Sequence, residues 1–295
     1  MIEAPRLHIA IQKSGRLAEQ SRELLKECGI RFSEGVRGRM TARAENFPLD
    51  LMFVRDDDIP TFVADGVCQL GIVGLNVLEE QDPAIADRLQ LVTKLGFGYC
   101  DLRIAGLASE GPLNLSDVDG QRIATSYPRL LSRFLADRGL HAEIVEMQGA
   151  VEIAPRLGIA RFVCDLVSSG ETLHANGLKA FCDVLASEAV LVRTGGAMSP
   201  ELDRLAHALA QRIDGVRTTA GSKYIVLNAP ESAVAAISNI LPGVEAPTVV
   251  PLIGRPGYVA VQAVCQESVF WETLEALKAA GGSGILVMPS EKMML

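Results

Sequence analysis

One stretch decides the fold of the C-terminal part: residues 222–288 read SKYIVLNAPESAVAAISNILPGVEAPTVVPLIGRPGYVAVQAVCQESVFWETLEALKAAGGSGILVM. Apolar runs typical of strands alternate here with amphipathic segments typical of helices, and glycine or proline separates nearly all of them. The predicted order β-α-β-β-α-β is the ferredoxin-like signature. Such a module suits the sensing of a small molecule, although an oligomerisation domain would carry the same pattern. The predicted strands are Ser222–Asn228, Thr248–Leu252, Tyr258–Cys265 and Gly284–Met288, and the predicted helices are Ser232–Leu241 and Glu267–Ala280.

Upstream of this module, short apolar strands alternate with helices from the N-terminus, which predicts an α/β fold with a mainly parallel sheet. A second α/β unit begins near Asp101, and the segment Val184–Val192 is expected to return to the first. Two lobes joined by crossing segments, an architecture shared with periplasmic solute-binding proteins, form a hinged cleft for ligands. The predicted boundaries are 1–101 with 183–222 for lobe I, 102–182 for lobe II, and 223–295 for the terminal module.

The predicted elements of the two lobes follow the apolar periodicity. The strands are Leu7–Ile11, Leu49–Val54, Leu70–Val73, Leu102–Leu107, Arg122–Thr125, Ala142–Met147 and Phe162–Val167, and the helices are Arg16–Cys28, Asp56–Asp65, Pro128–Arg138 and Ala150–Leu157.

Charge and composition narrow the class of function. With 295 residues and a net charge of −8, the chain is long enough for two or three domains and too acidic for a typical nucleic-acid binder. An acidic protein must bind anions locally, through backbone N–H groups or a few placed cations. No apolar run approaches the roughly 18–20 residues that span a membrane.

The cysteines and histidines do not indicate a metal site. The six cysteines are scattered and the four histidines lack metal-binding spacing, so buried free thiols in a reducing compartment are expected. The N-terminus already resembles a core strand at Leu7–Ile11 rather than a signal peptide. The expected compartment is the cytoplasm.

The strongest candidate site is the stretch Asp165–Leu173, where a buried strand leads into a turn of small residues and then into a helix. Small residues allow close approach of the backbone to a ligand, and the first N–H groups of a helix are unpaired. Such amides bind an anion without a basic side chain. Asp165 can accept hydrogen bonds from sugar hydroxyls, as acidic residues after strands do elsewhere. An ordinary strand-to-helix turn with a serine cap is the alternative.

Two further strand ends carry charges. In Gln12–Arg16, two cations surround a Ser-Gly turn after the first strand, which suits a polyphosphate, although a solvated turn would have the same sequence. Arg55 ends another strand and precedes Asp56–Asp58. Those acids are expected to cap and charge the following helix. A magnesium site there is the less favoured interpretation.

These motifs together resemble the ATP phosphoribosyltransferase family. The resemblance extends over nearly the whole chain in the family's order and includes the C-terminal module of its long form. The segments that carry it are Ile11–Leu17, Val54–Pro60, Leu70–Gly74, Arg122–Pro128, Val151–Arg156, Cys164–Leu173, Pro247–Leu252 and Ile285–Pro289.

The resemblance implies a glycosyltransferase reaction in which N1 of ATP displaces pyrophosphate from C1 of phosphoribosyl pyrophosphate. Magnesium (Mg2+) is expected to arrive on the pyrophosphate rather than in a protein cage. The resemblance also implies two groups of binding residues. Phosphoribosyl pyrophosphate would be bound by Glu152, Asp165, Ser168, Ser169, Gly170, Glu171, Thr172 and Leu173, and the nucleotide or pyrophosphate by Lys13, Ser14, Gly15, Arg16, Arg55 and Asn76.

Two residues depart from the family pattern. Glu171 places a carboxylate in the phosphate turn and must point outward, and Leu75 replaces a residue that is usually polar. The resemblance further implies assembly into dimers and hexamers, and inhibition by histidine bound within 223–295, with ligands that the sequence does not assign.

Two other functions have to be weighed against this one. A non-enzymatic binding module would share the two-lobed architecture, but the terminal sensing module argues against it. A catalytically dead regulatory subunit would keep the fold without the phosphate turn. The intact stretch Asp165–Thr172, with Lys13 and Arg16, argues against that alternative.

Overall fold

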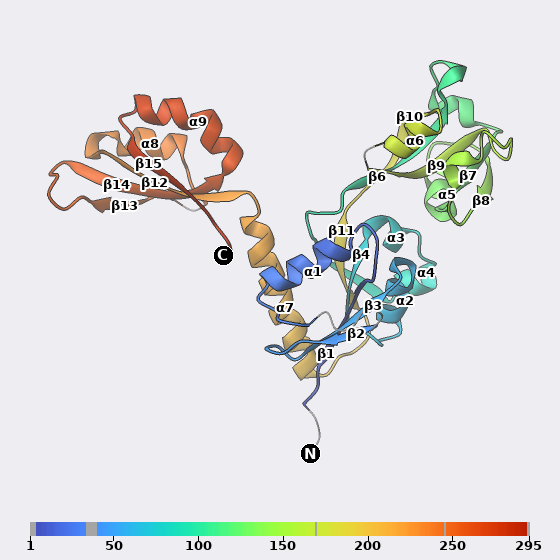
Figure 1. Ribbon diagram of the computed structural model, residues 1–295, viewed down its shortest axis with the longest axis horizontal. Helices are drawn as coiled ribbons and strands as arrows, with labels where there is room; N and C mark the ends of the chain where they lie inside the picture. Colours follow the sequence, from blue (N-terminus) through green and yellow to red (C-terminus); the bar gives the residue numbers. More distant parts are fainter. Residues whose placement is uncertain (1–3, 34–39, 169, 245, 294–295) are drawn as a thin grey trace. The chain divides into compact units, whose positions relative to one another are not determined.

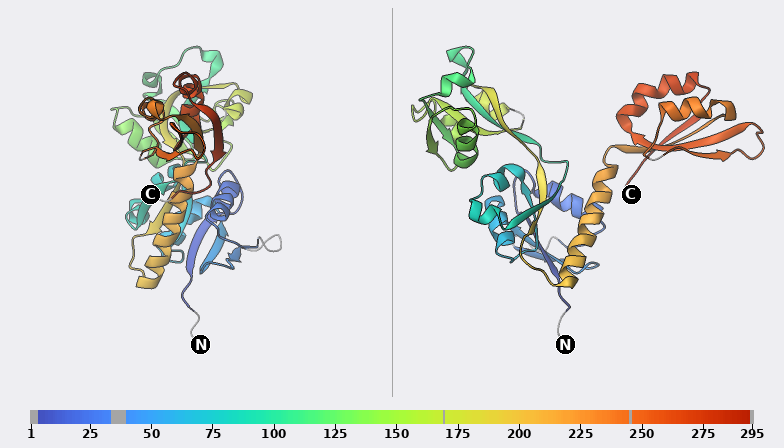
Figure 2. Two further views of the ribbon diagram at one scale, coloured as in Figure 1. Left: turned by 90° about the vertical axis from the view of Figure 1, so that its left-hand side faces the viewer. Right: turned by 180° about the vertical axis from the view of Figure 1, so that it is seen from behind.

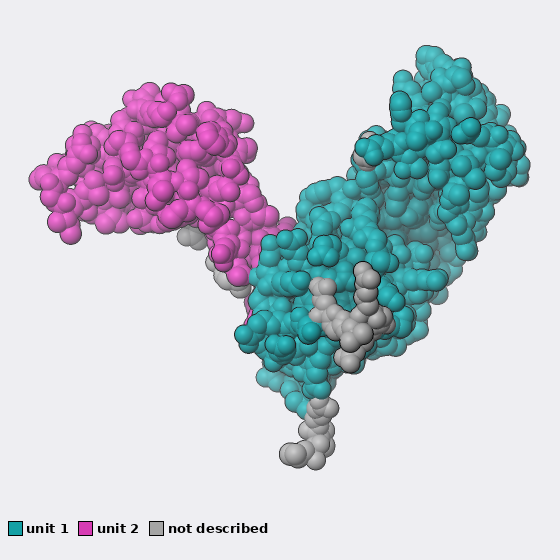
Figure 3. Space-filling model, in the orientation of Figure 1, with its two compact units in different colours: residues 1–210 teal, residues 211–295 magenta. Residues whose placement is uncertain are grey.

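The structure is a computed structural model that describes residues 4–33, 40–168, 170–244 and 246–293. The chain divides into two compact units, Met1–Ala210 and Gln211–Leu295 (Figure 3). The helix α7 (Pro200–Thr219) runs across the division, so the two units share a continuous helix. The sequence predicts no element there.

The first unit begins with a six-stranded sheet in the order β2-β3-β1-β4-β11-β5 (Figure 1). β1 pairs in parallel with β3 and β4, whereas β2 pairs antiparallel with β3, and β11 pairs antiparallel with β4 and β5. The sheet is therefore mixed, and the prediction of a mainly parallel sheet is wrong, because the returning strand β11 and the edge strands run antiparallel to their neighbours. The predicted strands are confirmed because their apolar residues are buried in this sheet. The elements are β1 (Leu7–Gln12), α1 (Ala18–Glu27), β2 (Thr41–Arg43), β3 (Leu49–Val54), α2 (Ile59–Ala64), β4 (Leu70–Gly74), α3 (Leu75–Glu79), α4 (Pro83–Ala86), β5 (Leu89–Lys94) and β11 (Ala189–Thr194).

The second sheet of this unit has five strands in the order β10-β6-β9-β7-β8. The long antiparallel pair β6 and β10 connects it to the first sheet, because β6 follows β5 and β10 precedes β11 along the chain. Its core packs the helix α5 against the sheet. The elements are β6 (Cys100–Leu107), β7 (Arg122–Thr125), α5 (Pro128–Ala136), β8 (Glu143–Glu146), the 3-10 turn η4 (Val151–Ile153), β9 (Phe162–Val167), α6 (Glu171–Ala175) and β10 (Leu178–Ser187).

The second unit confirms the ferredoxin-like prediction. Its four strands lie in the order β13-β14-β12-β15, and every neighbouring pair is antiparallel. Both helices cover one face of the sheet and bury a core that includes Ile225, Val261 and Leu277 (Figure 2). The elements are β12 (Ser222–Pro230), α8 (Val234–Ile240), β13 (Thr248–Pro251), β14 (Tyr258–Gln266), α9 (Glu267–Ala279) and β15 (Ser283–Pro289).

Two local predictions are wrong. The helix expected over Ala150–Leu157 forms only the short 3-10 turn Val151–Ile153. Ala150 takes the left-handed conformation (φ 51°), and Pro155 has no N–H to donate, so a regular helix cannot extend through both. In the described turn Asp56–Asp58, no carboxylate accepts a capping hydrogen bond.

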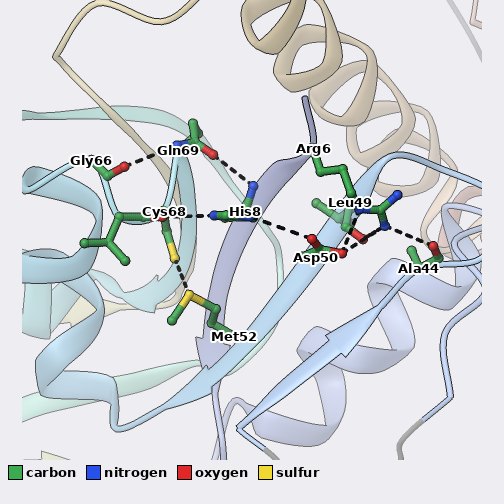
Figure 4. Close-up of polar contacts among 10 residues, drawn as sticks. Arg6, His8, Ala44, Leu49, Asp50, Met52, Gly66, Cys68 and Gln69 are labelled. Atoms are coloured by element: carbon green, nitrogen blue, oxygen red, sulfur yellow. Dashed lines mark hydrogen bonds and ion pairs between the residues drawn. The ribbon is translucent and has the colours of Figure 1, made fainter. Parts of the chain in front are cut away.

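Polar contacts connect residues at the amino ends of β1, β3 and β4 (Figure 4). Arg6 Nε donates to Asp50 Oδ1 over 2.9 Å, and the backbone N–H of His8 donates to Gln69 Oε1 over 2.9 Å. These contacts lie at the beginning of β1, whereas the charged residues Lys13 and Arg16 follow its end. Within the described residues, no helix combines the length and apolar character needed to cross a membrane.

Candidate functional site

The turn after β9 is open toward solvent at Gly170. Gly170 is left-handed (φ 80°), and among the described residues a methyl group added there would meet only Val167 Cγ1, at 3.8 Å. Ser169 lies outside the described residues. The following helix α6 has just 5 residues, so the helix dipole adds less to anion binding than the sequence suggested. The backbone amides of the turn, rather than the end of α6, are therefore the main groups here that can meet an anion.

The side chains around this turn divide into buried and exposed groups. Leu173 is buried in the core of the lobe and anchors α6, so its side chain does not face a ligand. Glu171 and Thr172 are exposed. The expectation that the Glu171 carboxylate points outward is therefore met.

Asp165 and Glu152 bring two carboxylates close to the turn. Burial raises the pKa of Asp165, the backbone N–H of Leu166 opposes the rise, and the charge of Glu152 adds to it. Asp165 Oδ1 accepts that Leu166 hydrogen bond over 2.8 Å. A pair of neighbouring acceptors of this kind suits the hydroxyl groups of a sugar.

The turn after β1 is shaped by Gln12 and Gly15. The buried Gln12 Oε1 accepts from the backbone N–H of Leu17 over 2.8 Å and so holds the loop closed. Gly15 is left-handed (φ 113°), and a methyl group there would lie 2.7 Å from Gln12 Nε2. Lys13 and Ser14 are exposed, so this loop presents them to solvent at the end of the strand.

Arg16 has an unusual environment. Its Nη1 atom is buried and has no hydrogen-bond partner within the described part of the chain. A methyl group added to Gly98 would lie 3.3 Å from Nη1, and one added to Gly74 would lie 3.5 Å from Nη2. Buried donors in folded proteins are normally paired, so this guanidinium is a candidate donor to an anionic ligand.

Asn76 is 1 % exposed and uses its whole amide internally. Its Oδ1 accepts from Ser187 Oγ over 2.8 Å, and its Nδ2 donates to the Tyr127 hydroxyl over 3.1 Å. Ser187 Oγ also accepts the backbone N–H of Asn76, over 3.0 Å. Asn76 therefore joins the first sheet to the end of β10 and to the start of α5.

Arg55 and the acids after it stand at the end of β3. Arg55 is exposed. Burial raises the pKa of Asp57, Asp56 and Asp58 add to the rise, and Arg55 opposes it. No group of three or more His, Cys, Asp or Glu side chains in the described ranges has the arrangement of a metal site.

A cavity of about 850 Å³ lies between the end of β3, α3 and the start of α5. Its lining includes four acidic residues, Asp56, Asp57, Glu80 and Glu146, together with Tyr127 and Arg129. A smaller cavity of about 260 Å³ lies beside Ser168, Tyr99 and Ser187.

The structure brings several predicted residues into one region. Arg16 lies near Gly74 and the Cys100 thiol. Cys100 shares a hydrogen bond with Ser187. Ser187 in turn donates to Asn76, which donates to the Tyr127 hydroxyl. The charges of Asp165 and Asp57 both act on Tyr127. Lys13 and Arg55 stand at neighbouring strand ends, and the backbone N–H of Lys13 donates to Val54 O over 2.8 Å.

Sequence reasoning missed Tyr127, Glu80 and Ser187. A signal for Tyr127 was present, because Ser126-Tyr127-Pro128 directly follows a predicted strand, as Lys13 does. Glu80 and Ser187 gave no comparable signal, since their roles depend on contacts between distant segments.

Comparison with known proteins gives a consistent family. Residues 55–215 match the family described as ATP phosphoribosyltransferase, and residues 220–292 match the family described as HisG, C-terminal domain. The chain is 53 % identical over 291 residues to an ATP phosphoribosyltransferase of Maricaulis maris, covering 98 % of this chain and 99 % of that protein.

One solved structure supports the same family. An ATP phosphoribosyl transferase (HisG:HisZ) complex from Thermotoga maritima is similar with a TM-score of 0.57 and 25 % identity, covering 70 % of this chain and 98 % of that chain. A histidine kinase sensor domain with similarity to periplasmic binding proteins has a TM-score of 0.49 at 11 % identity over 73 % of this chain and 91 % of that chain.

Proposed function

The chain belongs to the ATP phosphoribosyltransferase family, and on this premise we propose how its residues carry out phosphoribosyl transfer. N1 of the ATP adenine displaces pyrophosphate from C1 of phosphoribosyl pyrophosphate, which gives phosphoribosyl-ATP. This reaction is the first step of histidine biosynthesis. The buried, unpartnered Nη1 of Arg16 is the observation that supports the assignment of the anionic substrate most directly.

The ribosyl group is proposed to bind beside the turn after β9. The turn amides from Ser168 to Thr172 hold the 5-phosphate, and Asp165 with Glu152 accepts hydrogen bonds from the ribose hydroxyls. The open space in front of Gly170 supports this role, because a phosphate needs close access to the backbone there.

Catalysis is proposed to depend on charge and geometry rather than on a strong base. Breaking the C1–oxygen bond develops positive charge on the ribose and negative charge on the departing pyrophosphate. Arg16 and Lys13 stabilise the pyrophosphate. The carboxylates of Asp165 and Glu152, near the ribose, stabilise the positive charge that develops on the ribose. Fixed positions of the two substrates supply the remainder of the barrier reduction.

Magnesium would be carried by the pyrophosphate and would supply charge neutralisation at the leaving group. Asp56 and Asp57 line the cavity, and the pKa of Asp57 is raised first by burial and then by the neighbouring carboxylates, which fits a nearby cation better than a bare phosphate. Arg55 and Asn76 belong to the nucleotide side of the site, Arg55 as an exposed cation and Asn76 through the groups that it holds in place.

The C-terminal unit is proposed to bind histidine as a feedback inhibitor, and the chain to assemble as dimers and hexamers. A ferredoxin-like module with its own core supports a separate sensing role. We place the activity in the cytoplasm, where the six free cysteines remain reduced.

The test is an assay of the purified protein with ATP, phosphoribosyl pyrophosphate and magnesium. We expect phosphoribosyl-ATP and pyrophosphate to form in equal amounts, with no product when magnesium is chelated. A folded protein that binds either substrate without turnover would instead favour the binding-module function.

A further inference from the structure

Helix α3 presents two polar residues to the start of α5. Asn76 and Glu80 are one helical turn apart, and the backbone N–H of Glu80 donates to Asn76 O over 3.1 Å. Residues with this spacing lie on one face of a helix. Both side chains contact the segment that follows β7 in the other sheet of the unit.

Glu80 binds the first turn of α5 with both carboxylate oxygens. Oε1 accepts from the backbone N–H of Arg129 over 2.8 Å, and Oε2 accepts from that of Leu130 over 2.9 Å. Burial raises the pKa of Glu80, although these two hydrogen bonds and the charge of Arg129 oppose the rise. The Glu80 carboxylate is therefore partly buried at the N-terminus of α5, where the helix dipole is positive.

These two hydrogen bonds satisfy the backbone N–H groups at the N-terminus of α5 that have no partner within the helix. Pro128 occupies the first helical position and has no N–H, and Leu131 N–H donates to Tyr127 O over 3.1 Å. The N–H groups of Arg129 and Leu130 are the remaining orphans of the first turn, and Glu80 takes both. The anion site of α5 is thus filled by the protein's own carboxylate and does not serve a substrate phosphate.

Tyr127 lines the same cavity as Glu80. Its hydroxyl oxygen accepts the hydrogen bond from Asn76, and its side chain lines the cavity of about 850 Å³. Burial raises the pKa of Tyr127 well above its ordinary value, and the charges of Asp165 and Asp57 add to the rise. The phenol therefore keeps its proton, and with its oxygen engaged by Asn76 the O–H bond is free to donate elsewhere.

We propose that Glu80 is a positioning residue for phosphoribosyl transfer. Glu80 fixes the first turn of α5, Asn76 fixes the phenol, and the Tyr127 hydroxyl donates a hydrogen bond to an oxygen of the bound phosphoribosyl pyrophosphate. The inference rests on the proposed function and adds to it a donor, Tyr127, and the residue that aligns that donor.

The neighbouring residue Glu79 provides a matched control. Its carboxylate pairs with the exposed Arg133 over 3.1 Å, and its backbone oxygen also accepts from Arg133 Nη2 over 2.7 Å. Glu79→Gln makes the same chemical change on the same helix, toward the same partner helix, and leaves the backbone contact intact. Exposed ion pairs of this kind contribute little to stability.

The experiment compares the wild type with Glu79→Gln, Glu80→Gln, Tyr127→Phe and the double variant Glu80→Gln/Tyr127→Phe by kcat/KM for phosphoribosyl pyrophosphate and by Tm. We expect Glu79→Gln to match the wild type. In Glu80→Gln and in Tyr127→Phe, kcat/KM should fall roughly 10- to 100-fold, which is the expected effect of misplacing one contact to the substrate. The kcat/KM of the double variant should be no lower than that of the less active single variant, because both changes remove the same hydrogen bond from Tyr127 to the substrate.

Losses that multiply in the double variant would overturn the proposal, since they would mean that Glu80 acts independently of Tyr127. A kcat/KM equal to that of the wild type in Tyr127→Phe would also overturn the proposal. Because phenylalanine keeps the packed ring, this variant remains informative even if Glu80→Gln fails to fold. An inactive wild type would refute the proposed function and this inference together. An active wild type with an unaffected Tyr127→Phe would refute the inference alone.

Discussion

Arg16 and Lys13 belong to one loop but have different surroundings. Arg16 buries a guanidinium nitrogen that has no partner among the described residues, whereas Lys13 is exposed on the turn itself. In the proposed site, the half-buried Arg16 would contribute preorganisation and the exposed Lys13 would contribute charge.

Lys13→Ala should lower kcat/KM at least about tenfold by removing one cation from the leaving group. The fold should survive, because the backbone N–H of Lys13 bonds to Val54 O and its carbonyl accepts from Arg22, and alanine keeps both contacts. Steady-state kinetics and thermal melting check this pair of outcomes. A large fall in Tm would show that Lys13 is structural.

Asp57→Asn should stabilise the protein at neutral pH. Because the pKa of Asp57 is raised in the folded state, its ionised form disfavours folding above that pKa, and the penalty disappears as the pH falls below the ordinary value of 3.8. The side chain is exposed, so the expected gain is only about 0.5 kcal/mol. Denaturant unfolding at several pH values measures it, and a gain that grew toward acid pH would contradict this reasoning.

At the scale of elements, strands were easier to predict than helices. Leu49–Val54, Arg122–Thr125 and Phe162–Val167 are short, mostly apolar segments, and the structure forms all three strands within the predicted bounds. The helix expected over Ala150–Leu157 fails where a left-handed alanine precedes it, a conformation that no periodicity reveals. The segment 200–219 gave no prediction, although it forms a helix of 20 residues.

The contact of β4 with α2 gives a stability prediction at this scale. A methyl group on Gly71 would lie 2.7 Å from Ile59 Cγ2 and 2.9 Å from Val63 Cγ2, so the strand and helix would have to separate. Gly71→Ala should cost about 1–3 kcal/mol of unfolding free energy, as overpacked cores do. Urea denaturation measures the loss, and an unchanged midpoint would mean that α2 adjusts freely.

The site was partly predictable because open α/β sheets bind ligands at the carboxyl ends of their strands. That rule selects Lys13, Arg55 and Asp165 as candidates from local sequence. It could not show that Asn76 bonds to Ser187, 111 positions away in the chain, or that Glu80 closes the end of α5 from 49 and 50 positions away. Such roles arise from packing between segments, which one sequence does not display.

For the whole molecule, the proposed regulation needs two sites whose binding energies are coupled. The C-terminal unit has a complete core of its own, and the helix α7 connects it without a break to the first unit. A ligand of the second unit could therefore act on the first by favouring one of two arrangements.

Free histidine should lower the rate of pyrophosphate release by the intact protein, at substrate concentrations near KM. A coupling of about 1–3 kcal/mol corresponds to a change of roughly 5- to 150-fold in affinity. Another amino acid, such as lysine, serves as the control ligand. A rate unaffected by histidine would remove the sensing role and leave an oligomerisation module.

The most direct test of the central claim is the affinity for phosphoribosyl pyrophosphate, measured by calorimetric titration of Gly170→Val and Gly177→Val. The two glycines flank α6, both are left-handed (φ 80° and φ 70°), and both face open space, so valine strains the backbone similarly at each. The account predicts that binding is lost in Gly170→Val and retained in Gly177→Val. Unchanged affinity in Gly170→Val would contradict it, because a side chain would then stand where the 5-phosphate has to bind.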